Sequence, residues 1–328
     1  MPTGDHVAYF ALGGTISMTA APAGGVVARL RGSELVSTVG DFPVEVRVHD
    51  PAAVPSASLT FDHVLDVVDA AEQAVAEGAI GIVLTQGTDS LEETAFLIDS
   101  VWTRDEPFIV TGAMRNPTMP GADGPANLLA ALQVASAPEA RSRGVLVPFL
   151  DEIHSARHVR KSHTTSPAAF VSPDVGPIGH VVEGTPQFLA GLPARRRITG
   201  WTRESVAGTL VALYTTTLDD DGKLLEGPSH SHQGLVVAGF GAGHVPAELV
   251  PVLVEINDAM PIVLCSRVGA GAVLANTYGA PGGERDLLSR GLVRGGFLHP
   301  FKARVLLRLL VAAGASRADI ADAFAAFG

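Results

Sequence analysis

Two short stretches of the chain place a threonine hydroxyl directly after glycine. They are Gly13-Gly14-Thr15 and Gly87-Thr88-Asp89. A threonine hydroxyl is a weak nucleophile until a base or a positive charge activates it. An aspartate beside it, at a helix N-terminus, should stay ionised and could bind a cationic ammonium group. Taken singly, the first stretch is better explained as a strand-to-loop turn. The second is better explained as a helix start in which Asp89 or Ser90 caps the helix with Glu92 or Glu93.

A third stretch, DEIHSARHVRKSHTT at 151–165, is dense in charge and follows an apolar segment. Lys161, if partly desolvated beside Asp89, could have a depressed pKa and act as a base, or hold charge near a hydroxyl. The alternative is a solvated basic loop. His154, His158 and His163 do not have a spacing that predicts a metal site, so we expect them on a surface loop and expect no metal.

Strands and helices alternate along the first half of the chain. Helical spacing predicts helices over Phe61–Glu77, Leu91–Trp102 and Ala126–Ala135. Near-continuous apolar strands are typical of a parallel sheet covered on both faces, and the sequence predicts them at Val7–Leu12, Ile80–Leu84, Phe108–Thr111 and Val145–Phe149. Because chemistry in such sheets sits at the carboxyl ends of the strands, this edge should gather Thr15, Ser56, Thr88, Asp89 and the loop after Thr111.

The pattern predicts two α/β domains. Residues 1–188 should form the larger N-terminal domain, with a mostly parallel sheet flanked by helices and with the catalytic groups. Residues 189–208 show no clear strand or long helix and should form a linker. Alternation resumes over 209–328, which should form a smaller domain of flavodoxin-like or Rossmann-like type.

Composition narrows the possible partners. The 328 residues are 47% hydrophobic and 17% charged, which favours packed cores over disorder. The formal net charge of −11 offers no basic face, so nucleic-acid binding is not expected. The sequence shows neither a signal-peptide pattern at the N-terminus nor 18 consecutive apolar residues, so we expect no membrane association. Cys265 is the single cysteine, which fits a reducing cytosol, and we expect a cytoplasmic protein.

One motif favours a different class of protein. LVVAGFGAGHVPAEL at 235–249 predicts a strand, a glycine-rich turn and a helix, as in dinucleotide-binding oxidoreductases. However, His244 stands at the third glycine position, and the following strand, PIVLCSR, ends in no acidic residue for a ribose. The fingerprint is therefore weak.

Together, these stretches resemble the bacterial-type L-asparaginases of the asparaginase/glutaminase family. The resemblance is colinear over essentially the whole chain and rests on LGGTIS, LTQGTDSLEETAFL, VTGAMRNPTMPGADGPANLLAAL, DEIHSARHVRKSHTT, GFGAGH and LHPFKARVLLRLL. It implies the two-domain α/β fold and hydrolysis of the side-chain amide of L-asparagine, with ammonia released. It also implies that no metal or organic cofactor is used. Members are commonly homotetramers built as dimers of dimers, so a homo-oligomer is expected.

The resemblance also implies residue roles. Thr15 resembles the nucleophile that forms an acyl-enzyme, and Thr88, Asp89 and Lys161 resemble the set that activates the nucleophile or water. Thr88 also resembles an oxyanion donor through its backbone N–H. The substrate-binding positions implied are Gly14, Ser56, Gly87, Thr88, Asp89, Met114 and, from the neighbouring subunit, Glu284. Among these, Asp89 would hold the substrate ammonium and Ser56 its carboxylate.

Four positions depart from the family pattern. The stretch Ala20–Leu30 lacks the lid tyrosine, Ala57 replaces a glutamine or glutamate, His244 replaces an asparagine, and Gln86 replaces a histidine. All four flank the expected nucleophilic centre, so catalysis should be retained while the preference between asparagine and glutamine stays open. The alternatives are a glutaminase-asparaginase, a related amidase of the same fold, and a non-catalytic amino-acid sensor.

Overall fold

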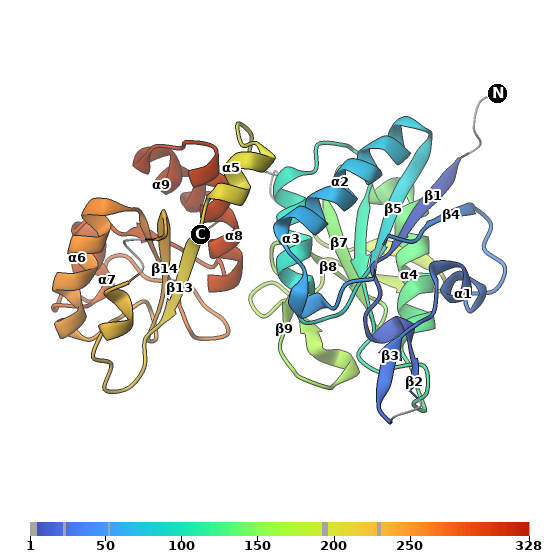
Figure 1. Ribbon diagram of the computed structural model, residues 1–328, viewed down its shortest axis with the longest axis horizontal. Coiled ribbons are helices and arrows are strands. Elements are labelled where there is room, and N and C mark those ends of the chain that lie inside the picture. Colours follow the sequence, from blue (N-terminus) through green and yellow to red (C-terminus); the bar gives the residue numbers. More distant parts are fainter. Residues whose placement is uncertain (1–4, 22–23, 52, 192–195, 228–230, 328) are drawn as a thin grey trace. The chain divides into compact units, whose positions relative to one another are not determined.

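The computed structural model describes residues 5–21, 24–51, 53–191, 196–227 and 231–327 (Figure 1). The chain divides into two compact units, Met1–Arg197 and Ile198–Gly328. Helix α5 (Arg203–Gly208) lies inside the 189–208 segment that we expected to be irregular. Thr202 caps this helix by accepting a hydrogen bond from the Ser205 N–H at 3.1 Å. Residues 192–195 of the same segment lie outside the described residues, and the linker boundaries stay a prediction.

The described part of the N-terminal unit contains an eight-stranded sheet in the order β12-β11-β8-β7-β6-β5-β1-β4. Its strands are β1 (His6–Ala11), β4 (Glu45–His49), β5 (Ala79–Thr85), β6 (Phe108–Thr111), β7 (Val145–Phe149), β8 (Glu152–Ser155), β11 (Gly179–Val182) and β12 (Thr185–Phe188). The pairs from β4 through β7 are parallel, whereas β7-β8, β8-β11 and β11-β12 are antiparallel. The sheet is therefore mostly parallel, as predicted, with an antiparallel extension that the sequence pattern did not reveal.

The central strands are buried on both faces. Alternate residues such as Val7, Tyr9, Val83 and Ile109 join one core cluster with Leu128 of α4. The intervening residues point to the opposite face, where α2 and α3 pack on the same strands. Burial on both faces explains why these strands read as unbroken apolar runs. The helices of this unit are α1 (Gly32–Ser37), α2 (Phe61–Ala76), α3 (Leu91–Val101) and α4 (Gly124–Ser136).

Two small hairpins complete the N-terminal unit. Strands β2 (Met18–Ala20) and β3 (Val26–Ala28) pair antiparallel just after the first glycine-rich turn. Strands β9 (Arg160–Lys161) and β10 (Phe170–Val171) pair antiparallel, and this second hairpin carries Lys161. The β2-β3 hairpin belongs to the segment in which the family tyrosine is missing, and residues 22–23 of that segment lie outside the described residues.

The C-terminal unit has a parallel sheet in the order β13-β14-β15-β16. Its elements are β13 (Val211–Thr215), β14 (Gly234–Gly239), α6 (Val250–Ala259), β15 (Ile262–Ser266), α7 (Glu284–Ser289), β16 (Val293–Arg294), α8 (Pro300–Ala312) and α9 (Arg317–Ala325). Leu235, Val237, Leu253 and Leu264 lie in its core cluster. The predicted fold class, a larger mostly parallel α/β unit and a smaller α/β unit, is confirmed.

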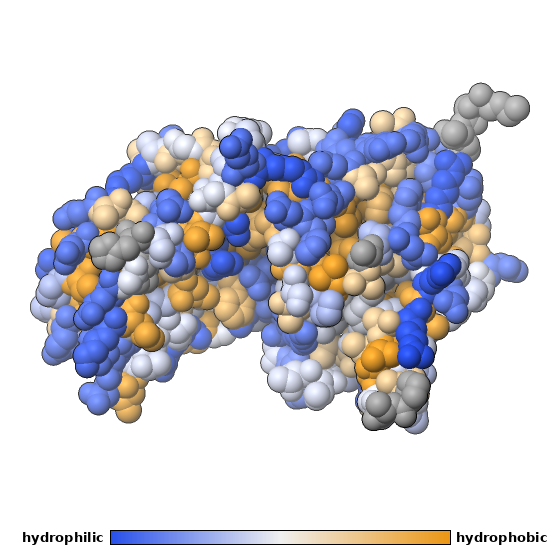
Figure 2. Space-filling view, in the orientation of Figure 1, coloured by the Kyte–Doolittle hydropathy of each residue, from blue (hydrophilic) through white to orange (hydrophobic). Residues whose placement is uncertain are grey.

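The displayed face of each unit carries hydrophilic side chains with hydrophobic ones between them (Figure 2). Large hydrophobic side chains that are strongly exposed include Leu189, Leu218 and Leu224. Within the described ranges, none of the helices combines the length and the apolar character needed to cross a bilayer.

Candidate active site

The carboxyl ends of neighbouring parallel strands bring the predicted residues of the N-terminal unit to one edge. Ala11 of β1 pairs with Thr85 of β5, and Thr85 pairs with Thr111 of β6. The chain leaves β1 into Gly13-Gly14-Thr15, leaves β5 into Gly87-Thr88-Asp89, and leaves β6 into the turn that contains Met114. The sequence-based expectation that these loops share one edge is therefore met by the register of the strands.

Gly14 and Gly87 touch backbone to backbone. A Cβ built on Gly14 would lie 2.2 Å from the Gly87 nitrogen, and one built on Gly87 would lie 2.5 Å from the Ser56 Oγ. Gly14 also adopts φ 92° and ψ −171°, a region that is essentially limited to glycine. Because the next residues in the two loops are Thr15 and Thr88, this close approach holds both threonines at one place.

Thr15 opens a short 3-10 helix, Thr15–Ser17, that is anchored from two sides. The Ser17 hydroxyl donates to the Gly14 carbonyl at 2.9 Å. Ile16 is fully buried against Gly124 at the start of α4, where a Cβ on the glycine would lie 2.7 Å from the isoleucine side chain. Thr15 itself is half-buried. Its hydroxyl is therefore held at the sheet edge by a buried neighbour without being enclosed.

Lys161 joins Thr88 and Asp89. Its Nζ donates to the Thr88 Oγ1 at 2.9 Å and to an Asp89 carboxylate oxygen at 3.0 Å. The lysine side chain is 16% exposed and the aspartate side chain 66% exposed. The hydrogen bond from Lys161 holds the pKa of Asp89 below its usual range, and the Ser56 hydroxyl adds to this effect against the opposing influence of burial. The charged lysine thus keeps an anion fixed beside a threonine hydroxyl.

Ser56 organises the start of α3. Its hydroxyl donates to the second Asp89 oxygen at 3.2 Å and accepts from the Asp89 N–H at 3.3 Å. The Ser90 hydroxyl donates to the Ser56 carbonyl at 2.8 Å. Ser90 occupies the N-cap of α3, yet its side chain makes no capping hydrogen bond. The capping box expected from Ser90 and the following glutamates is therefore wrong, because the Ser90 hydroxyl donates to the Ser56 loop instead.

The 151–165 segment is not simply a solvated basic loop. Its first part forms strand β8, in which His154 is fully buried, so the expectation that all three histidines lie on a surface loop is wrong for His154. His163 is exposed, as expected. Strand β8 pairs with both β7 and β11, and this position in the sheet buries the His154 side chain. Within the described residues, no group of three or more metal-ligating side chains was found.

Asp123 is a residue that sequence reasoning missed. It is buried and accepts hydrogen bonds from the backbone N–H groups of Met114 at 3.0 Å and Arg115 at 2.8 Å. The Asn127 amide donates to the same carboxylate at 3.1 Å. Asp123 thereby fixes the loop after β6 that contains Met114. An acidic residue just before the Gly-Pro that opens α4 was the available signal, but it could equally have indicated an ordinary helix cap.

Gln86 is fully buried between the strand end and the Gly87 turn. Its Nε2 donates to the Gly87 carbonyl at 3.2 Å, and its Oε1 is buried without a hydrogen-bond partner among the described residues. Gln86 therefore supports the turn that positions Thr88.

Glu284 lies at the start of α7 in the C-terminal unit. Its side chain is fully buried, and one carboxylate oxygen accepts from the Thr277 and Tyr278 N–H groups, each at 2.9 Å. The other oxygen lies 3.3 Å from the His244 Nε2, and the His244 ring packs edge-on against Tyr278. Burial alone would raise the pKa of Glu284, but the backbone donors outweigh it and hold the pKa below its usual range. Its predicted role in a neighbouring subunit stays a prediction.

The GFGAG segment does not form the turn of a dinucleotide-binding motif. The Phe240 N–H donates to the His244 carbonyl at 2.7 Å, and the His244 N–H donates back to the Phe240 carbonyl at 2.8 Å, which closes a tight loop. The next helical turn begins only at Ala247. The glycines therefore do not open a helix N-terminus, which is the group that binds a pyrophosphate in that motif.

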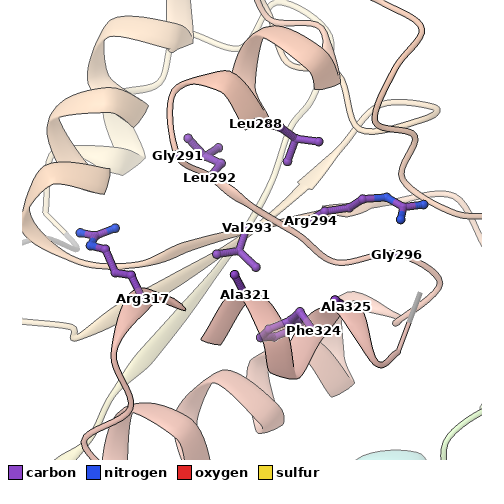
Figure 3. Close-up of a pocket in the computed structure, with 10 residues that line it drawn as sticks. All are labelled: Leu288, Gly291, Leu292, Val293, Arg294, Gly296, Arg317, Ala321, Phe324 and Ala325. Atoms are coloured by element: carbon purple, nitrogen blue, oxygen red, sulfur yellow. The ribbon is translucent and has the colours of Figure 1, made fainter. Parts of the chain in front are cut away.

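A pocket of about 390 Å³ lies in the C-terminal unit between β16 and α9. Figure 3 shows Val293, Ala321 and Phe324 gathered near its middle, with Arg294 and Arg317 extending on opposite sides. Arg317 donates to the Asn257 side chain at 3.2 Å, and Arg294 donates to the Val273 carbonyl at 2.7 Å. Both guanidinium groups thus support the surrounding fold, and none of the predicted site residues lines this pocket.

Two family models match the chain and together cover most of it. The model described as "Asparaginase, N-terminal" matches residues 6–193, and the model described as "Glutaminase/Asparaginase C-terminal domain" matches residues 210–324. The chain belongs to the asparaginase family. The family model of the N-terminal unit spans every predicted site residue except Glu284, which falls within the second match.

Individual members of the asparaginase family extend the comparison over the whole chain. A "Probable L-asparaginase" of Deinococcus radiodurans is 34% identical over 97% of this chain and 97% of its own length. A "Glutaminase-asparaginase" of Pseudomonas fluorescens biotype A is 34% identical over 92% of this chain and 84% of its length. The crystal structure of a probable cytoplasmic L-asparaginase from Campylobacter jejuni, 29% identical, superposes with a TM-score of 0.87 over 98% of this chain and 99% of that chain.

Proposed function

We propose that this protein is an L-asparaginase, an amidohydrolase that converts L-asparagine and water to L-aspartate and ammonia with Thr15 as the nucleophile. The observation that carries the proposal is the Thr88–Lys161–Asp89 cluster, with Nζ distances of 2.9 and 3.0 Å, at the strand edge that also holds Gly14-Thr15. Membership of the asparaginase family supports the same activity.

Recognition of the amino acid follows from charge. The Asp89 carboxylate, whose pKa Lys161 lowers further below neutral pH, is ionised and 66% exposed, so one oxygen can receive the substrate ammonium group. The single Ser56 hydroxyl proton, which Asp89 accepts in this structure, would turn to the substrate carboxylate when the ammonium group binds at Asp89. Gly14, Gly87 and Met114 lie on the loops that leave the same edge, and we propose that they contact the substrate there.

The chemistry uses the two threonines in sequence. The Thr15 Oγ attacks the amide carbon, and its proton passes to the Thr88 Oγ1, which releases its own hydroxyl proton toward the leaving nitrogen while Lys161 keeps its hydrogen bond to Thr88. The oxyanion that forms accepts a hydrogen bond from the Thr88 N–H, a contact of a type worth roughly 3 kcal/mol. Collapse breaks the C–N bond, the leaving nitrogen receives the proton, and ammonia departs. Water activated by the same pair then cleaves the aspartyl ester and restores Thr15.

The proposal includes an assembly and a compartment. We infer a cytoplasmic homotetramer, a dimer of dimers, in which Glu284 contributes to the site of a neighbouring subunit. The C-terminal unit holds Glu284 rigidly through two backbone donors and places His244 beside it. Size-exclusion chromatography with light scattering tests the tetramer. Glu284→Ala should raise KM for asparagine, and an unchanged KM would remove Glu284 from the site.

Replacement of the nucleophile tests the function directly. Thr15→Ala should abolish ammonia release from asparagine while the circular dichroism spectrum and the oligomeric mass stay unchanged. Thr15→Ser, which keeps a hydroxyl, is the matched control and should retain measurable turnover. Near-normal turnover by Thr15→Ala would overturn the assignment of the nucleophile, and absence of turnover by the wild type with retained asparagine binding would indicate a sensor.

A glutaminase-asparaginase is the second candidate. Ala57 is exposed next to Ser56 and offers no side chain to the substrate, and a relative of that name covers most of the chain. Parallel kinetics on asparagine and glutamine separate the two candidates. A kcat/KM for glutamine within about tenfold of that for asparagine, or about 1.4 kcal/mol, would favour the second candidate.

A further inference from the structure

Lys161 sits on a hairpin that does not belong to the main sheet. Among the strands of the described ranges, its strand, β9, pairs with β10 alone in a two-stranded sheet, with Phe170 opposite Lys161. A two-stranded hairpin is marginally stable by itself, so its position depends on contacts with the rest of the fold. The distance from the Lys161 Nζ to Thr88 is therefore set by whatever anchors this hairpin.

The side-chain contacts that connect the hairpin to the strands behind it include a ring stack and a hydrogen bond. The Phe170 ring stacks on Phe149 at the end of β7, with 4.2 Å between centroids and a 24° interplanar angle. Next to it, the Ser172 Oγ lies 3.0 Å from the Nδ1 of His154 on β8, and both residues are buried. The stack fixes the spacing of the hairpin from the sheet but tolerates sliding, whereas a hydrogen bond fixes direction.

The His154 ring is enclosed by its surroundings. It is fully buried in β8, whose register places His154 opposite Val147 of β7. Its Nε2 lies 3.3 Å from a Glu152 carboxylate oxygen on the same strand. Removing the hydrogen-bond partner of a polar group that is buried in this way destabilises the protein, because water cannot take the place of that partner. The contact with Ser172 is thus a directional link from the rigid sheet to the lysine hairpin.

We propose that His154 and Ser172 are positioning residues for Lys161, which they hold at hydrogen-bonding distance from the Thr88 hydroxyl. This inference rests on the proposed function. Loss of the link should slow the chemical step more than it weakens binding. Asp89 keeps its own hydrogen bonds to Ser56, which do not run through the hairpin, so recognition of the substrate ammonium should persist.

The test compares substitutions at Ser172, directly after β10, with a control serine in the loop between β9 and β10. Ser172→Ala should lower kcat for asparagine by about tenfold, as expected for a lost buried hydrogen bond, with KM changed less than twofold. Ser172→Thr, which keeps the hydroxyl, should recover most of the wild-type kcat. Ser166→Ala removes a hydroxyl that bonds only within the hairpin, to the Ala168 N–H at 3.2 Å, and should leave both constants unchanged.

Two further variants distinguish positioning from general loss of stability. His154→Asn keeps a polar group near the Nδ1 position and should exceed His154→Leu in kcat even where their melting temperatures agree. In the Lys161→Met background, Ser172→Ala should have no further effect on the residual rate, because both changes act through the same lysine. An additive effect, or a wild-type kcat for folded Ser172→Ala, would overturn the inference. An inactive wild-type enzyme would instead overturn the proposed function.

Discussion

The contact between Gly14 and Gly87 allows a quantitative prediction. Position 14 requires glycine for two reasons, the close contact and the backbone conformation, and two substitutions can separate them. Gly14→Ala would place a Cβ 2.2 Å from the Gly87 nitrogen, more than 1 Å inside an ordinary contact, against backbone that has no flexible end to move. The same substitution also forces alanine to adopt a φ of 92°. Gly40 has a φ of 79° but no atom within 4 Å of an added Cβ, so Gly40→Ala carries the conformational strain without the contact.

The two variants should therefore differ by at least the energy of the contact, since both have a positive φ and Gly14 combines it with a ψ of −171°. A strained backbone conformation costs about 1–3 kcal/mol, which both alanines pay. For Gly14→Ala, but not for Gly40→Ala, forcing packed atoms apart adds about 1–3 kcal/mol to the loss of unfolding free energy. Activity should separate them further, since a displacement of about 1 Å between reacting groups can lower the rate by about 100-fold.

Urea unfolding and ammonia release measure these two effects. Gly40→Ala should lose a modest part of the unfolding free energy and keep wild-type kcat/KM. Gly14→Ala should lose more unfolding free energy and at least about 100-fold in kcat/KM. If Gly14→Ala matches Gly40→Ala in stability and retains wild-type turnover, the close approach of the two loops does not position the threonines.

Three further predictions concern other contacts of the N-terminal unit. Lys161 lowers the pKa of Asp89, so the ion pair stabilises the fold above the usual aspartate range and loses its effect as pH falls through the lowered value. The stability gap between wild type and Lys161→Met, at most about 1 kcal/mol for so exposed a pair, should be present at pH 7 in urea unfolding and shrink as the pH falls below the usual aspartate range. Tyr9→Phe removes the hydrogen-bond partner of the buried Thr85 hydroxyl, 2.8 Å away, and should lower the free energy of unfolding in urea by about 1–3 kcal/mol. Adding Thr85→Val should restore part of that free energy, and no recovery would contradict this account. Asp123→Leu should raise KM for asparagine by freeing the turn after β6, and an unchanged KM in a folded variant would exclude that role.

Much of the fold follows from local sequence. Burial on both faces of a parallel sheet requires unbroken apolar strands, and helical spacing marks the covering helices, so the central strands and α2, α3 and α4 could be predicted within a few residues. The antiparallel strands β8, β11 and β12 could not be read in this way, because each is four residues long and carries too few apolar residues to show a period.

The sequence by itself determined that two glycine-threonine turns follow parallel strands and therefore share an edge. Only the tertiary structure decided what those turns meet. Lys161 reaches Thr88 across 73 positions of sequence, His154 is buried because β8 turns back along β7, and the Ser90 hydroxyl bonds to the Ser56 loop in place of capping its own helix. The physical reason is range: strand and helix patterns arise from contacts among near neighbours, whereas these polar contacts join segments whose proximity exists only after the sheet has formed.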